Sequence, residues 1–158
     1  MKNLIIDGIE FRPIRKYRIT IPDYFVSKCG KVWSDKQQKY LSVYPNYRGK
    51  KSDGYPPKCY EFSMTTEGKP FWDAGHKHKP KRKGSNVIEF RHKLHQAVKE
   101  AWEPYEDYVN TLSREELIEL ALESMLIDHK DDDVSNNHLD NLQYSTPLQN
   151  ASHRKAWK

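Results

Sequence analysis

Cysteine is scarce in this chain of 158 residues. Its two cysteines, Cys29 and Cys59, do not form a Cys-x-x-Cys pair. Two thiols exclude a disulfide framework and a four-cysteine zinc site. They suit free cysteines in a reducing compartment, so we expect a cytoplasmic protein.

Long apolar runs are missing as well. Hydrophobic residues make up 36% of the chain, and the mean hydropathy is −0.97. No stretch approaches the ~20 residues of a membrane-spanning helix, and residues 1–7 become charged too early for a signal peptide. The sequence predicts one compact domain, or a small core with an arm, and no association with membranes.

Positive charge is plentiful but unevenly placed. Residues 1–99 hold 22 Lys and Arg against 9 Asp and Glu, an excess of 13 positive charges. Residues 100–158 hold 5 against 13, an excess of 8 negative charges. A strongly basic body predicts a polyanionic partner, because phosphate contacts dominate nucleic-acid affinity. An acidic end would repel that partner, and a bound divalent cation is one way to bridge the two.

The first 64 residues read as strands and turns. Residues 17–33 alternate loosely around a Gly30-Lys31 turn and predict a hairpin. Two more strands are expected at Lys39–Tyr44 and Lys58–Met64, with a loop at Pro45–Pro57 between them. We therefore expect a β-rich N-terminal module over residues 1–64, which is part of the basic body that we expect to contact DNA.

A basic segment follows, and we expect a mobile loop over residues 65–89. It has no apolar period, and Phe71 and Trp72 lie next to its charges. A run of charge is often only a solubilising surface, and the sequence does not choose between that and a DNA-binding loop. The candidate DNA contacts here and just beyond are Lys77, Lys79, Lys81, Arg82, Lys83, Arg91 and Lys93.

Two helices are expected next. Phe90–Trp102 has apolar residues at helical spacing, namely Leu94, Ala97, Val98 and Ala101. Ser113-Arg114-Glu115-Glu116 is a capping box that predicts a helix over residues 113–125. We expect this second helix to serve packing, through an apolar face that includes Leu117 and Ile118.

The C-terminal quarter carries the residues with chemical potential. Leu126–His129 reads as a short strand that ends in Asp128 and His129, and a loop rich in Asp and Asn runs from Lys130 to Asp140. Asn141–Thr146 alternates as a second strand. Thr146-Pro147-Leu148-Gln149 then predicts a helix start, which places Asn150 and His153 on one helix face.

These residue types suit the hydrolysis of a phosphodiester. Carboxylate and amide oxygens are hard ligands that favour Mg²⁺ or Mn²⁺. A neutral imidazole beside them can take a proton from an attacking water. Clustered carboxylates are few, so we expect one metal ion rather than two.

The order of these motifs resembles the HNH family of homing endonucleases, particularly its phage-type members with Asn at the last position. The tight resemblance covers residues 126–153: Asp128-His129-Lys130-Asp131, Asn136-Asn137, Asn141-Leu142, and Asn150 followed by His153. A looser resemblance spans residues 17–156. It includes Leu94–Trp102, which is similar to a His-Arg-Leu-Val-Ala stretch of the family, and Tyr24–Ser34, which is similar to a small N-terminal module.

The resemblance implies an α+β fold, in which the β-rich part and basic loop precede a C-terminal ββα-metal nuclease core over residues 90–158. It implies that Asp128 and Asn150 bind the metal and that His129 is the general base. Asn141 would fix the loop that holds His129, and His153 would contact phosphate or the metal shell. The implied partner is double-stranded DNA, with the protein acting as a monomer or homodimer in a bacterial or phage-infected cell. No small-molecule cofactor is expected.

The chain also departs from the family pattern. Asp132 stands where the family often has Gly, and helix 113–125 resembles an insertion. The expected activity is cleavage of DNA, by a site-specific homing endonuclease or a nickase. A DNA-binding module of the same fold without activity is the alternative, and a nuclease that also acts on RNA is a third option.

Other sites fit less well. An EF-hand counted from Asp131 would need Gly at Asn136 and Glu at Leu142. No Gly-x-Ser-x-Gly elbow is present. Among the remaining histidines, we expect His95 to be packed and hydrogen-bonded near the site, and His76 and His78 to be exposed.

Overall fold

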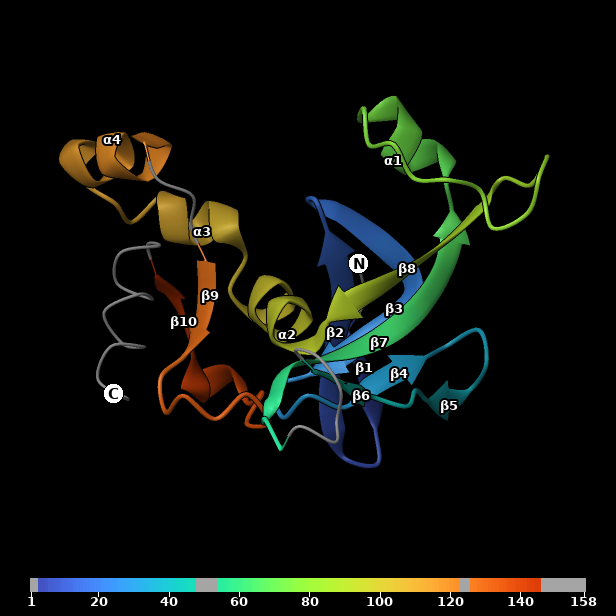
Figure 1. Ribbon diagram of the computed structural model, residues 1–158, viewed down its shortest axis with the longest axis horizontal. Coiled ribbons are helices and arrows are strands. Elements are labelled where there is room, and N and C mark those ends of the chain that lie inside the picture. The colour runs from blue at the N-terminus through green and yellow to red at the C-terminus, as the bar shows by residue number, and fades with distance from the viewer. Residues whose placement is uncertain (1–2, 48–53, 123–125, 146–158) are drawn as a thin grey trace.

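The computed structural model describes residues 3–47, 54–122 and 126–145, and Figure 1 shows their arrangement. The described chain combines three antiparallel sheets with short helices, a β-rich form of the expected α+β class. None of its described helices is long and apolar enough to cross a membrane.

The first sheet is a five-stranded meander. Its strands, in spatial and sequence order, are β1 (Leu4–Ile6), β2 (Ile9–Lys16), β3 (Ile19–Ser27), β4 (Val32–Ser34) and β5 (Lys39–Tyr40). The predicted hairpin over residues 17–33 is confirmed, because β3 pairs with β4 and Gly30 turns the chain at φ +83°. The sequence reading did not find β1 and β2.

The second sheet is formed by β6 (Tyr44–Tyr47), β7 (Pro57–Glu67) and β8 (Val87–Lys93). The prediction of one strand over Lys39–Tyr44 was wrong, because β5 and β6 are separate short strands in different sheets. The predicted loop at Pro45–Pro57 begins with β6, an edge strand, where a proline is tolerated. The strand predicted at Lys58–Met64 is confirmed and is longer.

The third sheet is a two-stranded ribbon of β9 (Leu126–His129) and β10 (Leu142–Ser145), close to the two short strands predicted at Leu126–His129 and Asn141–Thr146. The remaining elements are α1 (Lys69–Asp73), α2 (Leu94–Trp102), α3 (Tyr105–Val109), α4 (Arg114–Leu122) and the 3₁₀ turn η2 (Leu139–Asn141). The helix predicted to start at Thr146 lies outside the described residues.

Helix α2 is the centre of the molecule. It contacts β2, β3, β7 and β8 as well as η2, β9 and β10, and in Figure 1 it lies between the ribbon β9–β10 and the strands β7 and β8. One continuous core therefore joins all three sheets through this helix; it includes Ile14, Val26, Phe62, Ala97, Val98, Leu139 and Leu142. Because the ribbon shares this core, its position relative to β7 and β8 is fixed by packing.

The helix predicted over Phe90–Trp102 begins later than expected. Residues up to Lys93 belong to β8, where Ile88, Phe90 and His92 are buried and alternate with exposed neighbours. This alternation of buried and exposed residues is typical of a strand. β8 pairs with β7 from Glu67↔Val87 to Glu61↔Lys93. The strand pairing overrides the helical spacing that Leu94 and its successors continue.

The basic segment is more ordered than the predicted mobile loop. β7 continues to Glu67, β8 starts at Val87, and α1 forms within the connection between them. His76 and His78 are half-buried rather than exposed, because the ring of Tyr17 stacks on His76 at 4.2 Å. The connection is thus held against the β2–β3 turn.

Helix α4 begins as predicted but does not pack as predicted. The capping box is present, with Ser113 N donating to Glu116 Oε2 at 2.7 Å and Glu116 N to Ser113 Oγ at 3.2 Å. Leu117 and Ile118 are 38% and 54% exposed, so these two side chains do not serve the expected packing.

Candidate active site

The ribbon β9–β10 places Asp128 and His129 side by side at the end of β9. His129 pairs with Leu142 and Asp128 with Gln143, and the chain then leaves the ribbon as a loop. Lys130 N donates to Asn141 O at 2.8 Å, which closes this loop at its base. Because successive side chains of a strand point to opposite faces, Asp128 is half-buried and His129 is buried.

Asn141 binds the loop between β9 and β10 through its side-chain amide. Its Nδ2 donates to Asp131 Oδ1 at 2.7 Å and to the carbonyl of Asn136 at 2.8 Å, while its Oδ1 accepts from Asp131 N at 3.1 Å. The hydrogen bond from Asn136 and those from the loop lower the pKa of the Asp131 carboxyl. Both N–H donors of the Asn141 amide and its oxygen therefore bind the loop.

The residue that stands in place of glycine fits the loop. Asp132 has φ +60°, which is left-handed backbone. Glycine adopts this conformation most easily, and aspartate is among the few other residues that visit it routinely. The substitution therefore keeps the turn that follows Asp131.

His129 is oriented by Asn137. His129 is 5% exposed, and its Nε2 lies 3.1 Å from Asn137 Oδ1. The Asn137 amide nitrogen already donates to the carbonyls of Val134 and Ser135 at 3.1 and 3.2 Å, so the amide must turn its oxygen toward the imidazole. An oxygen can only accept, so Nε2 of His129 carries the proton and Nδ1 keeps its lone pair in the neutral ring.

A cavity of about 560 Å³ lies beside these residues. Asp128 and His129 line it from the ribbon, and Lys58 and Cys59 line it from β7. The rest of its wall is formed by Tyr55, Pro56, Pro57, Lys93, His95, Gln96, Leu126, Ile127 and Val134. His129 lines this cavity, and Nδ1 is the ring nitrogen that Asn137 does not engage.

His95 is the neighbour of His129 in this cavity. It lies in the first turn of α2, and the two rings meet edge to face with their centroids 5.1 Å apart. His95 is packed as expected, but the expectation that it is hydrogen-bonded fails at Nδ1, which is buried and has no partner among the described residues. Burial is the main cause that lowers the pKa of His95 to about 3, with the charge of His129 contributing.

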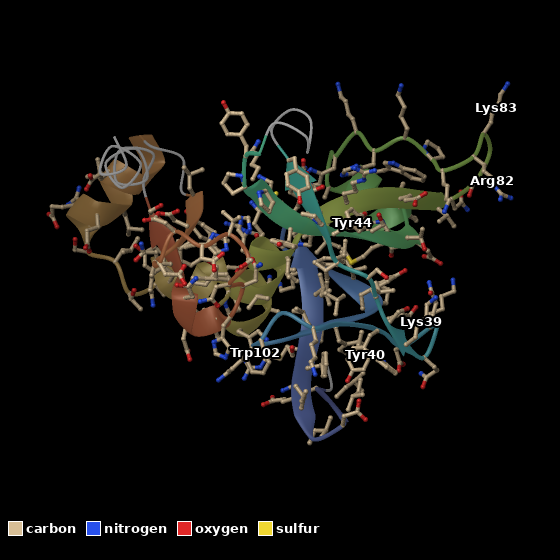
Figure 2. All side chains as sticks on the ribbon, turned by 60° about the horizontal axis from the view of Figure 1, so that its bottom comes forward. Lys39, Tyr40, Tyr44, Arg82, Lys83 and Trp102 are labelled. Carbon is tan, nitrogen blue, oxygen red and sulfur yellow. The ribbon has the colours of Figure 1, made fainter. Side chains whose placement is uncertain are left out.

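The predicted DNA contacts divide into two groups. Lys93 lines the cavity, and Lys79, Lys81 and Arg91 line a second hollow of about 450 Å³ on the sheet β6–β7–β8. Lys77, Arg82 and Lys83 are exposed on the connection between α1 and β8, where Figure 2 shows Arg82 and Lys83 projecting at its outer end. Lys58, which lines the cavity, was not among the predicted contacts.

Asn150 and His153 lie outside the described residues, so Asp128 is the only one of the two predicted metal ligands that the structure describes. Among the residues that the structure describes, no group of three His, Cys, Asp or Glu side chains could hold a metal ion. A site made by Asp128 and Asn150, completed by water and phosphate oxygens, needs no such group. A half-buried carboxylate on a cavity wall fits a hard cation, whereas His129 has its Nε2 engaged by Asn137.

Asn137, Lys58 and the Nε2 edge of His95 are the site features that sequence reasoning missed. Asn137 was quoted only as part of a motif, and its neighbour Asn136 is chemically the same. No local pattern distinguishes the asparagine that meets an imidazole from one that closes a turn. Lys58 reaches the site only because β7 runs beside α2.

No protein-family model and no curated protein matches the sequence. Among solved structures, the chain is similar to one described as "DNA binding and cleavage by the HNH homing endonuclease I-HmuI", with a sequence identity of 20% and a TM-score of 0.48. The similarity covers 99% of this chain and 59% of that chain, so this chain spans less than two thirds of that protein's length. The family named in that description is the one that the sequence motifs resemble.

Proposed function

We propose that this chain is a DNA endonuclease that hydrolyses phosphodiester bonds with the help of one divalent metal ion. The observation that carries the proposal is the orientation of His129. Asn137 engages its Nε2 at 3.1 Å, which leaves the lone pair of the neutral ring on Nδ1, and His129 and Asp128 line the same cavity. A neutral imidazole with its lone pair toward a cavity is equipped to take a proton from water.

In this proposal His129 Nδ1 accepts the proton of the water that attacks phosphorus. Asp128 and Asn150 would hold Mg²⁺ or Mn²⁺, which would supply positive charge to stabilise the leaving 3′-oxygen. Asn141 acts on the base indirectly, because it fixes the loop that carries Asn137. His153 would contact the phosphate or complete the metal shell.

The substrate that we propose is double-stranded DNA lying along β7 and β8. Lys58 and Lys93 line the cavity, and Lys79, Lys81 and Arg91 line the second hollow on the same two-strand platform. These cationic side chains therefore extend from the cavity with Asp128 and His129 to the basic segment between α1 and β8. Phosphate contacts of this kind fix the position of a duplex without reading its sequence.

Plasmid cleavage tests the proposal. Supercoiled plasmid and DNA from the protein's own source are incubated with the protein in Mg²⁺, Mn²⁺ or EDTA, alongside the variants Asp128→Ala and His129→Ala. We expect nicking or cutting that needs metal and that each variant abolishes. Cutting that continues in EDTA, or salt-sensitive DNA binding with no cutting of either DNA, would refute an endonuclease of this type.

A further inference from the structure

His95 has a polar atom that the packing of the core does not explain. Its ring is 8% exposed and its Nδ1 is buried without a partner, whereas a phenylalanine would fill the same space without leaving a polar atom unpaired. His92 also has a buried Nδ1 without a partner, but its Nε2 contacts the carbonyl of Arg15, whereas His95 lies on the wall of the cavity.

His95 lines the cavity, and of its two ring nitrogens only Nδ1 is among the buried atoms without a partner. A proton on Nδ1 would bury an N–H group with no acceptor, which is a rare defect in proteins. The favoured tautomer therefore carries its proton on Nε2, where the cavity can supply an acceptor.

The two imidazoles thus present opposite groups to one cavity. His129 presents the lone pair of Nδ1, because Asn137 holds its other nitrogen as a donor. His95 presents the N–H of Nε2, and its depressed pKa keeps the ring neutral, so that it donates without releasing the proton. The edge-to-face contact at 5.1 Å fixes each ring relative to the other.

We infer that His95 is a second catalytic residue, whose Nε2–H donates a hydrogen bond to a non-bridging oxygen of the phosphate that is cut. This inference rests on the proposed endonuclease function. A fixed donor at the place where negative charge grows stabilises the transition state more than the ground state. Lys93, on the same wall, places a positive charge near that oxygen.

The test compares His95→Phe, which keeps a ring but has no donor, with His95→Gln, which keeps a neutral N–H. His92→Phe is the matched control, because His92 is also buried, also has an unpartnered Nδ1 and contacts the carbonyl of Arg15 instead of the site. We expect His95→Phe to lower the single-turnover cleavage rate by about 10²–10³, as for the loss of one such donor. His95→Gln should recover part of that loss, and His92→Phe should cut at close to the wild-type rate.

A sulfur at the scissile phosphate gives a readout that mere structural damage does not change. Sulfur accepts hydrogen bonds weakly, so wild type should cut one of the two phosphorothioate diastereomers slowly. Replacing Mg²⁺ by Mn²⁺ should not restore the rate of that cleavage. His95→Phe should lose that discrimination. Equal rates for wild type and His95→Phe, or full discrimination kept in His95→Phe, would overturn the inference while leaving the endonuclease standing.

Nitrogen-15 spectra of the imidazoles test the same inference in the folded wild-type protein and need no variant. We expect His95 to show a proton on Nε2 and a bare Nδ1. A proton on Nδ1 would overturn the assignment. If the wild-type protein cuts neither plasmid nor its own DNA, the proposed function itself fails and takes the inference with it.

Discussion

His129 and Asn137 are joined by a hydrogen bond of 3.1 Å between Nε2 and Oδ1, and the direction of that bond decides the chemistry of the site. Asn137 cannot turn its nitrogen to the ring, because that nitrogen donates to the carbonyls of Val134 and Ser135. The loop therefore selects one tautomer of His129 before any substrate arrives. Preorganisation of this kind is what distinguishes a general base from a packed histidine.

The first prediction concerns Asn137. Asn137→Ala removes the acceptor that holds His129, so we expect DNA cleavage to fall by about 10–100-fold, the usual effect of losing such a supporting partner. The control is Asn136→Ala, which loses a hydrogen bond to Asp131 but none to His129. Cleavage rates of the two variants at equal metal concentration check this, and an equal effect of both would contradict a specific role for Asn137.

The second prediction concerns Gly30, whose turn lies against the loop that carries Asn137. A Cβ at this residue would lie 3.3 Å from Leu94 Cδ2 and 3.5 Å from Asn137 Cβ. Gly84 also has positive φ but has open space around it, so Gly84→Ala measures backbone strain alone. We expect Gly30→Ala to lose about 1–3 kcal/mol more of the free energy of unfolding than Gly84→Ala, because it also overpacks the core.

Urea denaturation of both glycine variants checks this difference. Equal losses would show that the contact of Gly30 with Leu94 and Asn137 is relieved easily. Since Gly30 touches Asn137, we also expect Gly30→Ala, and not Gly84→Ala, to cleave DNA more slowly.

The third prediction concerns Glu100, a half-buried acid on α2. Burial raises its pKa to about 7, although Lys16 and Arg15 oppose the rise. The folded protein then holds a proton that the unfolded chain releases near the ordinary glutamate pKa of 4.5. The stabilising effect of this proton is therefore complete below pH 4.5 and is lost as the pH rises toward 7.

Glu100→Gln mimics the protonated form at every pH. We expect its free energy of unfolding to exceed that of wild type by about 1–3 kcal/mol at pH 8 and to equal it at pH 4. Glu119→Gln, at an exposed residue of α4, is the control and should leave the pH dependence unchanged. A gain from Glu100→Gln that is equal at both pH values would contradict the proposed titration.

The fourth prediction concerns the path of DNA. Lys58→Gln and Lys93→Gln remove cations from the cavity wall, whereas Lys39→Gln removes one from β5. We expect each of the first two to reduce the slope of log K against log salt by about 0.9, the value for one phosphate contact. Lys39→Gln should leave the slope unchanged, and an equal effect of all three would argue for binding by net charge alone.

Sequence reasoning succeeded where the information was local. The Ser113–Glu116 capping box, the Gly30 turn and the strand that ends at His129 all depend on a few neighbouring residues, and each is present. It failed where pairing with a distant strand decides the outcome. Phe90–Lys93 follows β7 rather than its own helical spacing.

The site shows the same division. The resemblance pointed to Asp128 and His129, which share a cavity wall, and to Asn141, which closes the loop. It gave no role to Asn137 and none beyond packing to His95, because both depend on contacts made in three dimensions. The roles of Asn150 and His153 stay predictions.

The most direct test of the account is chemical rescue of His129. His129→Gly should abolish metal-dependent cleavage and leave a space in the cavity wall, and added imidazole should restore part of the rate in Mg²⁺ or Mn²⁺. His129→Gly that cuts at the wild-type rate without imidazole would contradict the claim that His129 is the base that activates water.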